Sequence, residues 1–155
     1  MNSIISSDVK YCKISKRIMA YIIDMIVLTA IFLIEAMIAV KFKHLVSYNK
    51  YKFILDLLGL LNAIIYFSVF ESSSKQGSVG KMAMSIIVHD ANGNRLSLRK
   101  AILRNIIKFF GSIIWIISGI NKMTYISYAG YCFAFFTPGN QALHDKIAGS
   151  FVIDK

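Results

Sequence analysis

The chain has 155 residues, of which 56% are hydrophobic and 17% are charged, and its formal net charge is +10. Soluble domains average about 45–50% apolar and about 25% charged residues, so this composition does not fit an ordinary soluble domain. The 13% aromatic content excludes a disordered chain. Strongly basic chains often bind nucleic acid, so the placement of the 18 Lys and Arg residues decides between a basic soluble protein and a membrane protein.

The positive charges lie between long apolar runs. The first run, residues 18–40, contains only two charged residues, Asp24 and Glu35. A helix needs about 20 residues to cross the hydrocarbon core of a bilayer, so we predict a transmembrane helix over about 17–40. A second apolar run predicts another helix over 53–70.

A third apolar stretch, residues 106–136, is too long for one span and short for two. Its break at 119–122 follows Ser118 and is typical of a turn. We therefore expect helices over about 98–118 and 123–136, which gives three to four transmembrane helices.

The basic residues are unequally divided between the two sides of this arrangement. With four helices, 13 Lys and Arg lie on the side of the termini and 5 on the other side. The positive-inside rule then places both termini in the cytoplasm of a cell membrane, while a three-helix arrangement moves only the tail outside. The charge is thus a topology signal, and we expect no nucleic-acid partner.

A short strand is expected between the second and third helices. Residues 85–89 are rich in β-branched side chains and precede a strong turn signal at 90–94. Residues 150–154 have the same character, and we expect the two segments to pair in a small cytoplasmic sheet, with fraying of the tail as the alternative. The predicted fold class is an all-α membrane protein with this small sheet, in one domain over 1–155.

The third helix is predicted to start at the membrane surface. Ser97 is a good N-cap for a helix that begins at Leu98. Lys100, Arg104 and Lys108 recur at every fourth position, away from an apolar face. This pattern is typical of a helix that begins in the headgroup layer, so we expect these three side chains to contact lipid headgroups.

Three blocks of sequence, in this order, resemble the RDD family of integral membrane proteins. They are KRIMAYIID at 16–24, the segment 77–105 with GSVGK, the strand and LSLRKAILRN, and QALHDKIAG at 141–149. The family is named after one Arg and two Asp, and the resemblance implies that these are Arg17, Asp24 and Asp145. It also implies a membrane architecture; transport of ions or small solutes has been proposed for the family, which has no settled general function.

Acidic residues inside the first apolar run are candidates for function. At 100° per residue, Arg17, Asp24 and Glu35 fall within about 20° of one stripe on the first helix. An ionised carboxylate facing lipid costs at least about 2.5–3.5 kcal/mol, so the stripe should face protein or water. Asp56 and Asn62 on the second helix are the expected neighbours.

Two interpretations of these residues remain open. In the first, Asp24, Glu35, Asp56 and Asn62 line a path for a cation (H⁺ or Na⁺) or a small solute. In the second, Asp24 caps a backbone loop or pairs with an arginine, and Asn62 joins two helices. Arg17 likewise has two candidate partners, lipid phosphate and the Asp145 carboxylate.

Transport is the leading function. We expect a homo-oligomer, because four short helices enclose little space by themselves. The alternative is an accessory or scaffold protein that binds a partner or anionic lipid through its basic cytoplasmic face. We expect no enzyme and no cofactor, because no nucleophile can be placed beside His144 and Asp145, where we expect a turn or helix-cap role. No His or Cys spacing fits a metal site, and residues 77–81 lack the phosphate-loop pattern.

Overall fold

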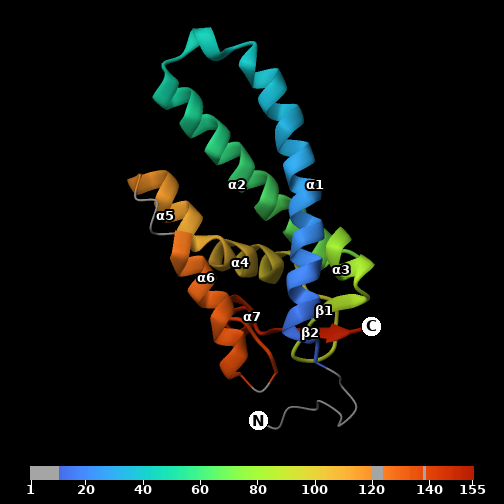
Figure 1. Ribbon diagram of the computed structural model, residues 1–155. Helices are drawn as coiled ribbons and strands as arrows, with labels where there is room; N and C mark the ends of the chain where they lie inside the picture. The colour runs from blue at the N-terminus through green and yellow to red at the C-terminus, as the bar shows by residue number, and fades with distance from the viewer. Residues whose placement is uncertain (1–10, 120–123, 138) are drawn as a thin grey trace.

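The computed structural model describes residues 11–119, 124–137 and 139–155. Helices dominate, and the described residues form one two-stranded sheet, near both ends of the described chain (Figure 1). In chain order the elements are α1 (Ile14–Val40), η1 (Lys43–Leu45), α2 (Tyr48–Ser72), α3 (Val79–Ala83), β1 (Ile86–Asp90), α4 (Leu98–Lys108), α5 (Phe110–Ser118), α6 (Thr124–Cys132), η3 (Phe133–Phe136), α7 (Leu143–Ile147) and β2 (Ser150–Asp154).

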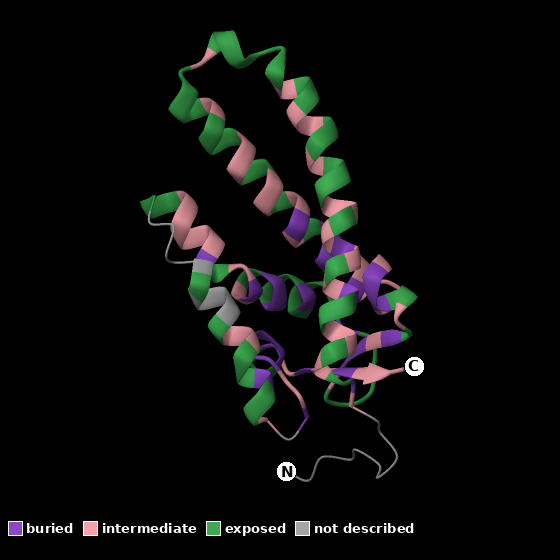
Figure 2. Ribbon diagram, in the orientation of Figure 1, coloured by how far each residue is buried: buried purple, intermediate pink, exposed green. Residues whose placement is uncertain are grey.

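The first two apolar runs form a long helical hairpin, α1 and α2, connected through η1 (Figure 1). Both helices are long and apolar enough to cross a membrane. Most of the hairpin beyond its base is exposed or half-exposed, as Figure 2 shows, and this surface includes Ile26 and Met37. An apolar surface of this extent is typical of contact with lipid or another subunit rather than water.

The expected single helix over 98–118 was wrong. Residues 98–118 form two helices, α4 and α5, which meet at Phe109 and are bent by 58°. The bend follows from packing, because α4 is polar along its inner face and lies against α2, whereas α5 is apolar and lies against α6. As a pair, α4 and α5 make at most one further span.

The predicted fourth helix corresponds to α6 with η3. Part of its predicted start, and most of the predicted turn, fall on residues 120–123, outside the described residues. Gly119 ends α5 in the left-handed region, with φ of 72°, where a residue without a Cβ is favoured.

The predicted pairing of the two strands is confirmed, and the tail does not fray. β1 and β2 are antiparallel, with Ile86 opposite Asp154 and Asp90 opposite Ser150. The N-terminal segment joins them, since the Cys12 N–H donates to the Val152 carbonyl at 3.0 Å. The described chain therefore begins and ends in the same small assembly.

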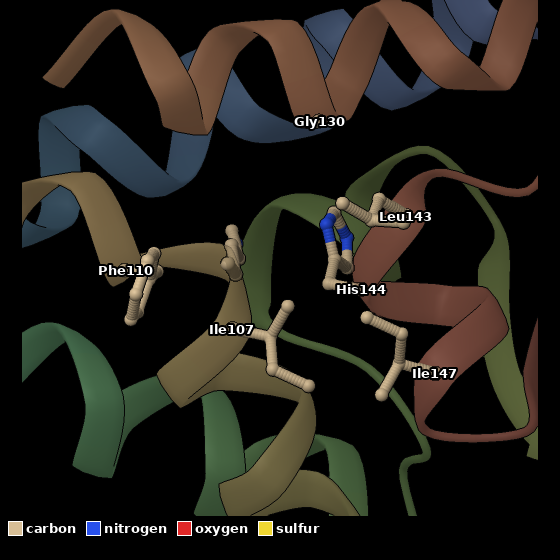
Figure 3. Close-up of a pocket in the computed structure, with 7 residues that line it drawn as sticks. Ile107, Phe110, Gly130, Leu143, His144 and Ile147 are labelled. Atoms are coloured by element: carbon tan, nitrogen blue, oxygen red, sulfur yellow. The ribbon is translucent and has the colours of Figure 1, made fainter. Parts of the chain in front are cut away.

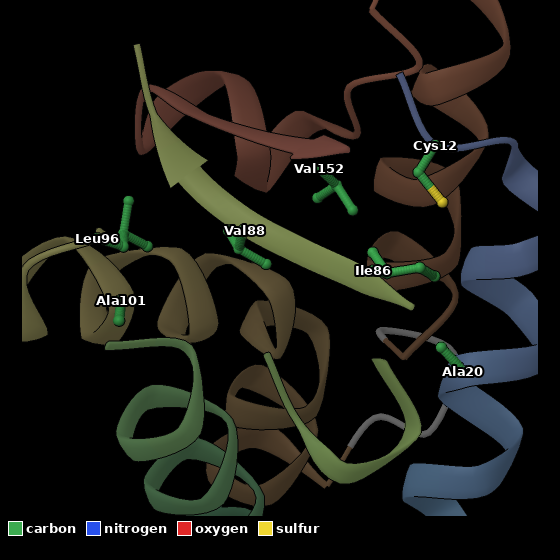
Figure 4. Close-up of a cluster of buried hydrophobic side chains, with 7 residues drawn as sticks. All are labelled: Cys12, Ala20, Ile86, Val88, Leu96, Ala101 and Val152. Carbon is green, nitrogen blue, oxygen red and sulfur yellow. The ribbon is translucent and has the colours of Figure 1, made fainter. Parts of the chain in front are cut away.

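A compact apolar cluster lies beneath this sheet (Figure 4). It brings together side chains from the N-terminal segment, α1, both strands, the loop before α4, and α4 itself. Its members are Cys12, Ala20, Ile86, Val88, Leu96, Ala101 and Val152. Burial of these residues fixes the sheet against the base of the hairpin, where the polar site lies.

The segment 71–80 contains the last two residues of α2 and the first two residues of the short helix α3. α3 packs against α1 at Gly80, where an added Cβ would lie 1.9 Å from the Ala20 carbonyl oxygen. Only glycine fits at this contact.

Candidate functional site

Charged side chains gather where α4 crosses the base of the α1–α2 hairpin. Four are cations and three are acids, and they come from α1, α2, α3, α4 and α7. Burial of charge is costly unless each group is paired, so the partners of each side chain decide what the site does. We call this set the buried charge cluster: Arg17, Asp24, Glu71, Lys81, Arg104, Lys108 and Asp145.

Arg104 stands at the centre of the buried charge cluster and is 3% exposed. Its Nε and Nη2 donate to Asp145 Oδ1 at 2.8 and 2.6 Å, and its Nη1 lies 2.5 Å from Glu71 Oε2. One guanidinium therefore joins the end of α2 to α7. The geometry uses the planar fork of arginine, which a lysine cannot reproduce.

The expected headgroup contacts of Arg104 and Lys108 were wrong, because α4 is oriented the other way. Its basic face points into the protein, and its apolar face is open, with Leu98 50% and Leu103 46% exposed. The amphipathic pattern is real, but the polar face meets buried acids and the apolar face meets the surroundings. Lys100 alone of the three is outside, with its Nζ 3.8 Å from an Asp90 carboxylate oxygen.

Glu71 and Lys81 form a second pair that sequence reasoning missed. Glu71 Oε1 lies 2.5 Å from Lys81 Nζ, and Asn105 Nδ2 donates to Glu71 Oε2 at 3.1 Å. Burial and the nearby Arg104 charge lower the pKa of Lys81 despite the Glu71 carboxylate. An acid at the very end of an apolar run was the available signal for this pair.

Asp145 accepts from both arginines of the cluster. Arg17 Nη1 donates to its Oδ2 at 2.7 Å, so of the two candidate partners of Arg17 the structure shows the carboxylate. The same oxygen accepts the Ala142 N–H at 3.1 Å and caps α7, as the helix-cap interpretation expected. Burial acts to raise the pKa of Asp145, but the Arg104 and Arg17 charges hold it well below its ordinary value.

Asp24 is held by three donors at the base of the hairpin. Its carboxylate accepts from Tyr66 Oη at 2.7 Å, Ser78 Oγ at 2.5 Å and the Gly80 N–H at 2.7 Å. Tyr66 Oη in turn accepts the Val79 N–H. This matches the structural interpretation, in which Asp24 caps a backbone segment: it seats the start of α3 against α1 and α2.

Glu35 and Asn62 meet in the outer half of the hairpin. Asn62 Nδ2 donates to Glu35 Oε2 at 2.6 Å, and both residues are half-buried. Asp56, predicted as a neighbour, instead lines a cavity of about 240 Å³ together with Phe32 and Trp115. The four predicted path residues are thus spread along the hairpin, with one direct contact among them.

A larger apolar cavity of about 290 Å³ lies between α4, α6 and α7 (Figure 3). Ile107, Phe110 and Leu143 line it, and the His144 ring projects from α7 toward α6. Burial and the nearby cationic charges lower the pKa of His144 to about 3, despite Asp145 beside it. The imidazole is therefore neutral at physiological pH.

Two apolar helices of membrane-spanning length, with a buried charge cluster at one end, define an integral helical membrane protein. The model of the RDD family matches residues 11–149, and the chain belongs to this family. No curated protein and no solved structure matches the chain. Within the described residues, no group of three His, Cys, Asp or Glu side chains is placed to hold a metal ion.

Proposed function

We propose that this protein is a transporter of the cell membrane that moves a cation, H⁺ or Na⁺, or a small solute along the seam between α1 and α2. The contact between Glu35 and Asn62 carries the proposal. Glu35 lies within a helix of membrane-spanning length, and its only hydrogen-bond donor among the described side chains is the Asn62 amide. A half-buried carboxylate with spare acceptor capacity is suited to bind and release a cation.

The inner part of the proposed path has a different character. Asp24 stands 11 residues before Glu35, which is a rise of about 16 Å along α1. Its carboxylate is occupied by three donors, one of them the Tyr66 hydroxyl on α2. We assign Asp24 to holding the base of the seam in place, and Glu35 to exchange of the transported ion.

A membrane topology is part of the proposal. The hydrogen bond between Cys12 and Val152 supports placing both residues on one side of the membrane, with an even number of crossings between them. α5 and α6 have 9 residues each, against the roughly 20 that a span needs. These lengths support two full spans, α1 and α2, with α5 and α6 as a re-entrant hairpin, and the distribution of positive charge supports cytoplasmic termini.

Two membrane helices cannot enclose a path by themselves, so we propose that copies of the chain associate. The open apolar surface of the hairpin, which includes Ile26 and Met37, is available for such an interface or for lipid. Asp56 and Asn62 line neighbouring cavities at the α2 side of the seam.

Reconstitution in proteoliposomes tests the proposal, with an internal pH dye and a Na⁺ tracer as readouts. We expect Glu35→Gln to abolish cation-coupled signals in protein that still inserts. Asp154→Asn is the matched control, because it makes the same chemical change at an acid paired with Lys16 beside the sheet. Equal flux in Glu35→Gln and wild type contradicts the proposal.

The alternative is an accessory protein that acts through the basic residues left outside, such as Lys100. It predicts no flux from inserted, oligomeric wild-type protein, together with saturable binding to anionic lipid or co-purification of a partner.

A further inference from the structure

A small cavity of about 40 Å³ lies within the buried charge cluster, next to the apolar cavity of Figure 3, with which it shares the lining residues Lys108 and His144. Residues of α1, α2, α3, α4, α6, α7 and β2 line it. Its polar lining includes Arg17, Asp24, Lys81, Arg104, Lys108 and Tyr131. This volume is small, since a single water needs roughly 10–15 Å³ of such space.

The charges around this cavity do not balance. Arg17 and Arg104 pair with Asp145, and Lys81 pairs with Glu71. Asp24, the third acid of the cluster, is occupied by neutral donors. With all basic groups protonated, four cations face three carboxylates, and Lys108 is the one without a carboxylate partner. Burial and the Lys81 charge lower the pKa of Lys108 well below its ordinary value, so an anion beside it would favour the charged form.

Lys108 is 6% exposed, and no carboxylate among the described residues lies within ion-pair distance of its Nζ. The Nζ lies 3.3 Å from the centroid of the Phe67 ring, and 5.2 Å from the centroids of the Tyr21 and Phe109 rings. Ring faces attract an ammonium group but accept no full hydrogen bond from it. A buried lysine in this setting lacks a counter-ion.

Further donors at this cavity also lack acceptors. The Tyr131 hydroxyl is buried without a hydrogen-bond partner among the described residues. The same is true of Nε and Nη2 of Arg17, whose Nη1 is taken by Asp145. A buried donor without an acceptor costs about 1–3 kcal/mol, so an acceptor in the cavity would stabilise the fold.

We propose that this cavity binds one monatomic anion, chloride in the cell, held by Lys108 and the Tyr131 hydroxyl. A single anion supplies the charge that the cluster lacks and accepts from the donors left open. The volume has room for such an ion and is small for a bulky organic anion such as gluconate. Water would satisfy the hydroxyl but supplies no counter-ion for protonated Lys108. The site shares Asp24 with the base of the seam between α1 and α2, whereas the proposed ion-exchange contact of Glu35 and Asn62 lies in the outer half of the hairpin.

Thermal unfolding of the purified full chain in detergent tests the site, with NaCl or NaBr exchanged for sodium gluconate at constant ionic strength. A ligand that binds only the folded state raises Tm with concentration, so we expect a saturable rise with chloride and bromide and none with gluconate. Lys108→Met removes the surplus charge and keeps the length of the side chain. We expect it to weaken chloride binding at least about tenfold.

Two further variants and one direct measurement complete the test. Lys100→Met, on the exposed part of the same helix, should keep the full chloride response. Tyr131→Phe should weaken the chloride response. This variant replaces Lys108→Met in the test if Lys108→Met does not fold. Crystals grown with bromide should show an anomalous peak beside Lys108 Nζ. The proposal is overturned if chloride raises Tm no more than gluconate does. It is also overturned if the rise in Tm with chloride is unchanged in both Lys108→Met and Tyr131→Phe.

Discussion

Arg17 and Asp145 are 128 residues apart in the chain, and their side chains meet at 2.7 Å. The other carboxylate oxygen of Asp145 is held by Arg104. Two of the three family-motif residues thus join the first helix to the C-terminal segment, while the third, Asp24, seats α3. The motif assembles the base of the hairpin, and the cation path that we propose lies above it.

Removing the central guanidinium should destabilise the whole base. Arg104→Met leaves Glu71 and Asp145 buried without their shared cation, and breaking a buried ion pair costs about 3–5 kcal/mol. We expect a loss of that size in the free energy of unfolding, measured by denaturant titration in mixed micelles. Arg99→Met, on the exposed side of α4, is the control. A loss below about 1 kcal/mol for Arg104→Met would show that the cluster does not hold the fold together.

The contact between α3 and α1 should not tolerate a methyl group. A Cβ at Gly80 would lie 1.9 Å from the Ala20 carbonyl oxygen, whereas one at Gly59 would lie 3.5 Å from the Phe32 ring. We expect Gly80→Ala to lose at least about 1–3 kcal/mol and to yield little monodisperse protein. Gly59→Ala should elute as wild type in size-exclusion chromatography. Similar profiles for the two variants would mean that α1 and α3 are less tightly packed than described.

Acid should destabilise the protein through His144. Its pKa is lowered to about 3 in the folded state, mainly by burial, so the unfolded chain binds a proton near pH 6.5 that the folded chain does not bind. Stability is therefore full above that pH and falls as the pH drops toward the folded pKa. At pH 4.5 the loss from this residue is on the order of 2–3 kcal/mol.

The measurement is Tm against pH for wild type and His144→Gln. The variant should lose less stability between pH 6.5 and 4.5, while His44→Gln, an exposed change in η1, should follow wild type. Parallel curves for His144→Gln and wild type would contradict the assignment.

The two ends of the described chain should be open to cross-linking. Tyr11 and Ile153 are opposed in an antiparallel bridge. In a background of Cys12→Ala and Cys132→Ser, we expect Tyr11→Cys with Ile153→Cys to form an intramolecular disulfide on mild oxidation, detected by mass spectrometry. Phe42→Cys with Ile153→Cys should not, because Phe42 lies in the connection between α1 and α2, just before η1, whereas Ile153 lies in β2. Failure of the first pair would remove the basis for an even number of crossings.

The length of the apolar runs was enough to predict α1 and α2, because a long apolar run can be recognised from the local sequence alone. The strands were also predictable from β-branched residues beside a turn. The break at Phe109 was not predicted. The local signal for it is the Gly111-Ser112 pair that follows, and the packing of α4 against α2 and of α5 against α6 accompanies the bend. α3 was not predicted either, because a residue of another helix, Asp24 of α1, stabilises it through its carboxylate.

In the site, resemblance to the family identified Arg17, Asp24 and Asp145, but the partners of each were open. Periodicity showed that one face of α4 is basic, and the structure showed that this face is covered by protein. A basic stripe records which side of a helix is polar, and it carries no information on whether lipid phosphates or buried acids meet it. Glu71 was missed because its partners come from other elements: Lys81, 10 residues later, lies in α3, and Arg104 lies in α4.

The position of Asp145 near the end of the chain has a consequence for biosynthesis. α1, α2 and α4 are synthesised before this residue, so until it is made Arg17 and Arg104 lack the acid that joins them. A nascent chain that stops earlier has four cations of the cluster against only two acids. Insertion of the apolar helices and completion of the fold are therefore separate events, and the second waits for α7.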